Sequence, residues 1–185
     1  LGLKYLTKKR EFNYKKPEHL LEGYFTIKPK FIRKVNDDKS KVSVIIPTAN
    51  RKQLLKKVLT ALFNQDYDVS DYEIIIVDDN SDDGTGFMIE NIQTPVNIKY
   101  LFWPRKHKFV PGQPMNRVGP CRNLGAKHAG GKYLIFLDTD IVPNPELIKE
   151  HINSLQSEKT FVVGPSLRER TLYDERYAYL INCDD

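Results

Sequence analysis

The chain has 185 residues, of which 40% are hydrophobic and 29% are charged, and its formal net charge is +5. This composition is typical of a globular protein, and the length suits one domain rather than two of ordinary size. The sequence has no apolar run near the ~20 residues of a membrane-spanning helix, no secretory leader at its start and no cysteine framework, so we expect a cytoplasmic protein.

The positive charge lies in residues 1–41, which hold 12 Lys and Arg against 5 acidic residues, whereas the remainder holds 17 against 19. We therefore predict a basic, aromatic extension over residues 1–41 and one folded domain over residues 42–185. Basic residues mixed with aromatic ones attract anionic surfaces, so the extension permits peripheral contact with the inner face of the membrane. Packing on the domain or self-association is the alternative. We expect no nucleic-acid partner, because no module of that kind is present.

Short apolar runs between turn residues predict strands, and apolar positions at helical spacing predict helices. The predicted strands cover residues 41–47, 72–77, 97–102, 133–137 and 160–164. The predicted helices cover residues 52–64, 87–92 and 119–129, and a fourth begins with Asn144 as its cap and Pro145 in its first turn. Strands that alternate with helices form right-handed βαβ units. The predicted fold class is therefore α/β, with a mostly parallel sheet covered by helices on both faces.

Two acidic residues, Asp138 and Asp140, follow the predicted strand over residues 133–137. Ligands of open α/β sheets bind beyond the carboxyl ends of the strands. In extended chain, residues two apart project to the same side, so both carboxylates can close on one hard cation. The alternative is that these acids cap the helix that starts near Pro145.

Four motifs occur in a fixed order along the chain. They are Pro47-Thr-Ala-Asn-Arg51, Asp78-Asp-Asn-Ser-Asp-Asp-Gly-Thr85, Arg122-Asn-Leu-Gly125 and Leu137-Asp-Thr-Asp140. With the strands and helices between them, they resemble family 2 glycosyltransferases of the GT-A fold over about residues 41–164. The resemblance implies a metal-dependent, inverting transfer of a sugar from a nucleotide sugar, most often a UDP-sugar. The acceptor would be a carbohydrate or lipid-linked hydroxyl in the synthesis of surface or secreted polysaccharide.

The resemblance also implies roles for residues of the first two motifs. Pro47, Thr48 and Arg51 match the first nucleotide loop, which flanks the base. The family usually has an aromatic residue where this chain has Ala49, so base stacking would need another residue.

Asp79 matches the acid that accepts a hydrogen bond from uracil, and Asp78 matches the acid that supports the turn. The alternative for this pair is an Asx-type turn that stabilises residues 80–84. Arg122 matches an arginine that approaches the base or the diphosphate. Its alternative is a salt bridge to Asp78 or Asp79.

Asp138 and Asp140 match the metal motif of the family, in which the last acid ligates Mg²⁺ or Mn²⁺ and the first contacts ribose or metal. Such a cation neutralises the charge that develops on the departing diphosphate.

The general base is not identified. The acids near the end, which are Asp174, Glu175, Asp184 and Asp185, fall in no motif that matches the family. We therefore expect that the acceptor side is incomplete, and a nucleotide-sugar-binding or assembly module without its own base is the alternative function. A dinucleotide-binding Rossmann domain is disfavoured, because no Gly-x-Gly-x-x-Gly follows the first strand.

Overall fold

The computed structural model describes residues 6–8, 28, 30–33, 40–104, 117–155 and 162. These residues form a six-stranded sheet in the order β1-β6-β3-β4-β5-β2. The four inner strands are parallel, and they are β3 (Val42–Thr48), β4 (Tyr72–Asp78), β5 (Asn97–Phe102) and β6 (Tyr133–Phe136). The edge strands are antiparallel to their neighbours, and they are β1 (Leu6–Lys8) and β2 (Lys30–Arg33). The predicted mostly parallel α/β sheet is confirmed.

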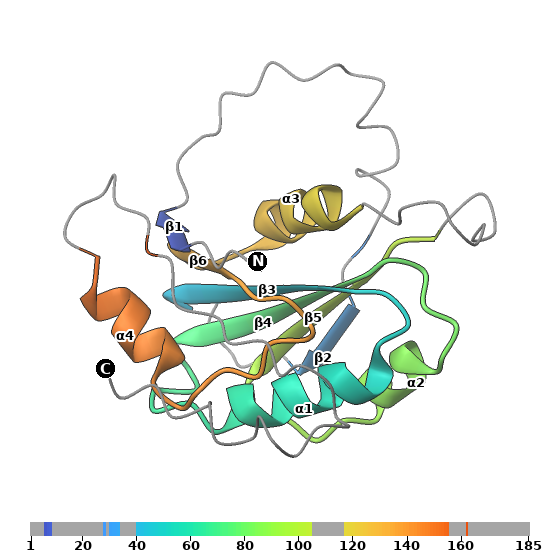
Figure 1. The fold of residues 1–185 in the computed structure, drawn as a ribbon, viewed down its shortest axis with the longest axis horizontal. Coiled ribbons are helices and arrows are strands. Elements are labelled where there is room, and N and C mark those ends of the chain that lie inside the picture. Colours follow the sequence, from blue (N-terminus) through green and yellow to red (C-terminus); the bar gives the residue numbers. More distant parts are fainter. Residues whose placement is uncertain are drawn as a thin grey trace, which may run out of the picture.

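Helices cover both faces of this sheet (Figure 1). Of the described helices, those that cover one face are α1 (Lys52–Phe63), α2 (Thr85–Glu90) and α4 (Leu147–Asn153). The other face carries α3 (Val118–His128). Two hydrophobic clusters result, because successive side chains of a strand point to opposite faces.

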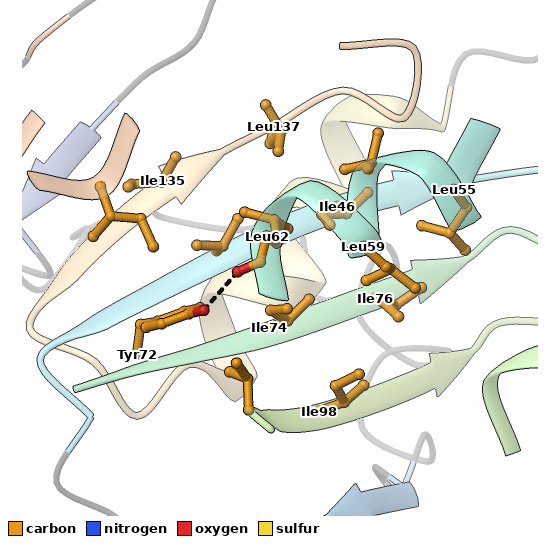
Figure 2. Packing of buried hydrophobic residues seen from close by; sticks show 14 of the residues in the cluster. Ile46, Leu55, Leu59, Leu62, Tyr72, Ile74, Ile76, Ile98, Ile135 and Leu137 are labelled. Carbon is orange, nitrogen blue, oxygen red and sulfur yellow. Dashed lines mark hydrogen bonds between the residues drawn. The ribbon is translucent and has the colours of Figure 1, made fainter. Parts of the chain in front are cut away.

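The larger cluster lies between the sheet and α1 (Figure 2). α1 buries Leu55, Leu59 and Leu62, which recur at helical spacing and form one apolar stripe. They pack on fully buried strand residues such as Ile46 and Ile76. Burial of each such side chain contributes about 1.5–3 kcal/mol, so this cluster is the main source of stability among the described residues.

Tyr72 places a polar group inside this cluster. Its hydroxyl donates a hydrogen bond of 2.6 Å to the carbonyl of Leu62, drawn as a dashed line in Figure 2. Burial raises the pKa of Tyr72 to about 12, so the hydroxyl remains a donor at neutral pH. The bond ties the last turn of α1 to the first residue of β4.

The predicted elements agree with the observed ones to within one or two residues in most cases. The strand predicted over residues 97–102 matches β5, and the helix predicted over residues 119–129 corresponds to α3. The strand predicted over residues 160–164 lies outside the described residues, except for a bridge at Val162.

The predicted start of the fourth helix is wrong. α4 begins at Leu147 with Glu146 as its N-cap, and no side chain caps it. Asn144 and Pro145 instead form a turn that is closed by a 3.2 Å bond from the Leu147 amide to the Asn144 carbonyl. Proline suits the second position of such a turn, because its φ is fixed near the required value. Asp138 and Asp140 therefore do not cap α4.

Two short segments that precede residue 42 pair with the sheet. β1 pairs with β6, and β2 pairs with β5. The boundary between an extension over residues 1–41 and a domain over residues 42–185 stays a prediction. Within the described ranges, none of the helices has the length and apolar character that crossing a membrane requires.

Gly125 allows α3 to approach the sheet closely. A Cβ atom at this position would collide with the Cγ2 methyl of Ile45 and come within 3.3 Å of the Cγ2 methyl of Val77. Since Gly125 has no side chain, α3 can lie directly on β3 and β4. The position of α3 matters because Arg122 is on this helix.

We expect Gly125→Ala to lower the free energy of unfolding by about 1–3 kcal/mol, because overpacking forces the helix away from the sheet. Urea unfolding measures the change. Gly119→Ala on the same helix is the matched control, because a Cβ at Gly119 meets nothing within 4 Å. Equal stabilities of the two variants would contradict the close approach.

Candidate functional site

A cavity of about 590 Å³ lies beyond the carboxyl ends of β3, β4 and β6. This is the edge at which parallel α/β sheets bind ligands. Residues from three of the four motifs line it directly. The lining residues are Pro47, Thr48, Ala49, Asn50, Arg51, Asp79, Val118, Cys121, Asp138, Thr139 and Asp140.

Asp138 and Asp140 both line this cavity, and each is paired with an arginine. Arg122 donates to Asp138 at 2.5 Å, and Arg51 donates to Asp140 at 3.0 Å. The Arg122 pair is about one quarter exposed, whereas the Arg51 pair is about half exposed. The second pair is therefore strongly screened by water and is easily exchanged for another partner.

The two carboxylates fit a hard divalent cation. Mg²⁺ is usually held by one or two carboxylates together with water and substrate phosphates, and carboxylates also suit Mn²⁺. Among the described residues, no group of three or more His, Cys, Asp or Glu side chains could hold a metal by itself. A cation at Asp138 and Asp140 would therefore need further oxygen ligands, which a diphosphate can supply.

Asp79 lies at the other side of the cavity and is only 6% exposed. The Arg117 guanidinium donates to its carboxylate. That guanidinium also lies 4.4 Å from the centre of the Trp103 ring, at a distance typical of a cation–π contact. Arg117 thus brings a cationic, multiply donating group to the edge of the cavity beside Asp79.

Arg117 contacts a lining residue, Asp79, and the motifs did not identify it. It immediately precedes α3, five residues before Arg122. The only signal in the sequence is a second arginine at the start of that helix. The alternative role predicted for Arg122 is also wrong, because Arg122 pairs with Asp138 rather than with Asp78 or Asp79. The two arginines are separated by more than one helical turn, so their side chains reach different acids.

Asp78 supports the turn after β4, as predicted. It is fully buried, and its carboxylate accepts bonds of 2.7 Å from the Ser81 amide and from the Tyr100 hydroxyl. Burial raises the pKa of Asp78, although these hydrogen bonds act against the rise. Burial and the neighbouring Asp78 carboxylate also raise the pKa of Tyr100, which therefore remains a donor. The Asx-type turn is confirmed for Asp78, and it leaves Asp79 facing the cavity.

Asn50 joins the loop after β3 to the loop after β4. Its backbone amide donates to the Ser81 hydroxyl, and its side-chain oxygen accepts from the backbone amide of Asp82, both at 2.8 Å. Asn50 has a positive φ of 51°, a conformation that asparagine tolerates better than most residues. The two loops that carry Arg51 and Asp79 are thereby held together.

Thr48 adds a buried hydroxyl at the cavity. The residue is 3% exposed, and its Oγ1 atom has no hydrogen-bond partner among the described residues. A buried polar atom without a partner is costly, so a ligand with a donor or acceptor here would gain binding energy. The role of Thr48 in the nucleotide loop stays a prediction.

The general base stays unidentified. Three carboxylates line the cavity in the described part of the chain, and an arginine faces each one. The four acids near the end of the chain, from Asp174 to Asp185, lie outside the described residues.

Comparison with known proteins gives a consistent result. The family described as Glycosyl transferase family 2 matches residues 43–181. The Staphylococcus aureus protein TarS, named a poly(ribitol-phosphate) beta-N-acetylglucosaminyltransferase, is 32% identical over 110 residues, which make up 60% of this chain and 18% of TarS. A Campylobacter jejuni protein named GalNAc(5)-diNAcBac-PP-undecaprenol beta-1,3-glucosyltransferase is 40% identical over 101 residues, which make up 54% of this chain and 29% of that protein.

Among solved structures, S. aureus TarS in complex with UDP-GlcNAc is similar with a TM-score of 0.50 and 30% identity. The similarity covers 61% of this chain and 30% of the TarS chain. The chain thus spans less than a third of the length of these relatives.

The carboxylate of Asp83, like Asn50, joins the loop after β3 to the loop after β4. One oxygen accepts from the Lys52 amide at 2.8 Å, at the start of α1, and the other accepts from the Thr85 amide and hydroxyl, at the start of α2. Partial burial would raise the pKa of Asp83, but these hydrogen bonds outweigh it and hold the pKa below its usual range. One ionised side chain therefore serves the beginnings of two helices.

We expect Asp83→Ala to lower the free energy of unfolding at pH 7 by about 1–2 kcal/mol, the cost typical of a lost helix cap. Because the pKa of Asp83 is lowered on folding, its contribution is present above the pKa of the unfolded chain and is lost as the pH falls through the lower, folded value. Urea unfolding of the unaltered protein and of Asp83→Ala, at pH 7 and at about pH 2.5, tests this loss of stabilisation at low pH. Asp82→Ala, one residue earlier and exposed, is the control, and a difference for Asp83→Ala that stays constant with pH would contradict the assignment.

Proposed function

Because the chain belongs to glycosyl transferase family 2 and has the GT-A fold, we propose that its cavity binds a UDP-sugar and that the enzyme transfers the sugar to a hydroxyl acceptor. The observation that carries the proposal is the convergence of Thr48, Asp79 and Asp140 on one cavity from the ends of three parallel strands. These residues are far apart in the sequence. Their meeting at the ligand-binding edge provides donors and acceptors for a nucleotide together with carboxylates for a cation.

In this proposal, Asp79 and Arg117 bind the base. An acceptor next to a guanidinium matches a ring that has an N–H donor beside carbonyl acceptors, as uracil has. Pro47, Thr48 and Arg51 flank the nucleotide from the β3 loop, and Asp78 holds the β4 turn in place. The likeness to TarS, solved in complex with UDP and with UDP-GlcNAc, supports a uridine nucleotide.

Asp138 and Asp140 hold Mg²⁺ or Mn²⁺ in the same proposal, and Asp138 contacts either the ribose or the metal. When bound, the cation supplies a Lewis acid that neutralises negative charge on the departing diphosphate. Arg51 and Arg122 contact these acids in the structure, so both guanidinium groups are also near enough to bind phosphate oxygens.

The acceptor in this proposal is a carbohydrate or a lipid-linked glycan, in the synthesis of surface or secreted polysaccharide. The names of the relatives support it, since one acts on poly(ribitol-phosphate) and another on an undecaprenol-linked saccharide. We propose an inverting single displacement, in which a carboxylate takes the proton of the acceptor hydroxyl. The cytoplasmic location, with contact to the inner membrane face or self-association through the extension, belongs to the same proposal.

One observation favours a second candidate, a nucleotide-sugar-binding module without its own base. In the described residues, each carboxylate that lines the cavity already has an arginine as its partner, and two of them, Asp138 and Asp140, are assigned to the cation. Release of UDP from a UDP-sugar by the purified chain, measured with and without acceptor glycans, separates the two candidates. Turnover excludes the binding module, and tight UDP binding without turnover favours it.

We expect calorimetric titration to show that UDP binds in the presence of Mn²⁺ and that GDP and TDP bind more weakly. Asp140→Asn should weaken UDP binding by about tenfold or more, because an interaction with a charged group contributes about 1.5–3 kcal/mol. Asp82→Asn removes the same charge from an exposed position and is the control. Unchanged UDP affinity in both Asp138→Asn and Asp140→Asn would contradict the metal assignment.

We expect Arg117→Ala to weaken the binding of uridine, which has no phosphate, and of UDP by a similar factor of about tenfold. Asp140→Asn should leave uridine affinity unchanged, because in this proposal Asp140 binds the cation that contacts the diphosphate, and uridine has no diphosphate. Arg117→Lys keeps the charge but loses the planar set of donors, so an intermediate affinity is expected. Arg117→Ala with normal uridine affinity would exclude this residue from the base site, and thermal unfolding shows that each variant is folded.

A further inference from the structure

Thr139 lies between the two acids of the metal motif and lines the cavity with them, and its hydroxyl bonds to the sheet rather than to either acid. The residue is 3% exposed, and its hydroxyl donates a 2.5 Å hydrogen bond to the Pro47 carbonyl at the end of β3. Asp138 and Asp140, on either side, carry the carboxylates that pair with arginines at the cavity. The middle residue of the motif is therefore attached to the sheet, and its neighbours face the cavity.

The hydrogen bonds between β3 and β6 explain why this attachment is needed. The amides of Tyr133 and Leu137 donate to the carbonyls of Lys41 and Ile45, each at 3.0 Å. In a parallel pair, every second residue bonds to the same neighbouring strand, so the next acceptor of β3 on this side is the Pro47 carbonyl. The corresponding donor on the β6 side is residue 139.

Proline interrupts this pairing. Pro47 has no N–H to donate to the β6 side, so the regular ladder cannot continue past Leu137. The chain turns instead, and the Ile141 amide closes the turn by donating to the Asp138 carbonyl at 3.1 Å. The Thr139 hydroxyl takes the place of the next backbone donor and bonds to the Pro47 carbonyl. The side chain thus joins the turn to the sheet where the backbone no longer does.

We propose that Thr139 is the positioning residue for the Asp138–Asp140 pair, and that its hydrogen bond to Pro47 sets the affinity of the pair for a divalent cation. The inference rests on the proposed function, since it assigns a cation to these acids. A carboxylate pair binds a cation well only when both oxygen donors are already in place, and partners that orient ligands commonly change metal affinity by about 10- to 100-fold. Thr139 acts through the turn, by way of its bond to the Pro47 carbonyl.

The test compares Thr139→Val with Thr139→Ser. Valine keeps the branched shape and loses the donor, whereas serine keeps the donor. Binding of Mn²⁺ in the presence of saturating UDP is followed by electron paramagnetic resonance of the free ion, and uridine affinity is measured by calorimetry. We expect Thr139→Val to bind Mn²⁺ about 10- to 100-fold more weakly with unchanged uridine affinity, and Thr139→Ser to restore binding to within a few-fold of the unaltered protein.

Thr60→Val, on the exposed side of α1, is the matched control, and it should leave both affinities unchanged. If Thr139→Val binds Mn²⁺ as tightly as the unaltered protein, the inference is wrong and the proposed function stands. If the unaltered protein binds UDP without any dependence on Mn²⁺, the metal role in the proposed function is wrong and this inference fails with it.

A measurement on the unaltered protein keeps the inference testable if Thr139→Val does not fold. A buried hydroxyl that donates to a carbonyl exchanges its proton slowly, so nuclear magnetic resonance should show a Thr139 hydroxyl proton close to the Asp138 and Pro47 protons. A rapidly exchanging hydroxyl would overturn the inference.

Discussion

The backbone of β3 is the part of the molecule on which the candidate site depends. It lies between β6 and β4, and its last carbonyls hold the loops that follow both neighbours. The Thr48 carbonyl accepts from the Asp79 amide at 2.8 Å, and the Pro47 carbonyl accepts from the Thr139 hydroxyl. The acid assigned to the base and the acids assigned to the cation are therefore positioned against the same two residues. A displacement of the end of β3 would move both ends of the site together.

The acidic and basic side chains at this edge balance one another among the described residues. Asp79, Asp138 and Asp140 each have an arginine partner, but the three pairs differ in how easily they can be exchanged. The Asp140 pair is about half exposed and contributes little net stability, so exchange of Arg51 for another cation costs little. The Asp79 pair is more buried, and removal of its arginine would leave a buried charge. The pair of Asp79 with Arg117 is therefore harder to exchange than the pair of Asp140 with Arg51.

The sequence predicted the fold class and the edge of the sheet at which the site lies, because both depend on local patterns. An apolar run such as residues 97–102 identifies its own strand, and acids that follow such runs lie at the carboxyl edge. The partners of those acids could not be predicted in the same way. Arg117 lies 38 residues after Asp79, whereas Arg122 lies 16 residues before Asp138. Only the packing of α3 on the sheet decides which arginine reaches which acid. Thr139 gave no signal, since its role depends on the register of β6 with β3.

The position of α3 connects the stability of the fold with the chemistry of the site. Gly125 packs on Ile45, and this contact sets the distance between the helix and the sheet. Arg122 is about one turn earlier on the same helix, and its guanidinium pairs with Asp138. The distance between α3 and the sheet, which Gly125 sets, therefore also sets the distance between these two side chains. A larger side chain at position 125 would shift Arg122 away from Asp138 as well as strain the core. The glycine of the Arg-Asn-Leu-Gly motif therefore helps to position the arginine that pairs with Asp138, although Gly125 does not itself line the cavity.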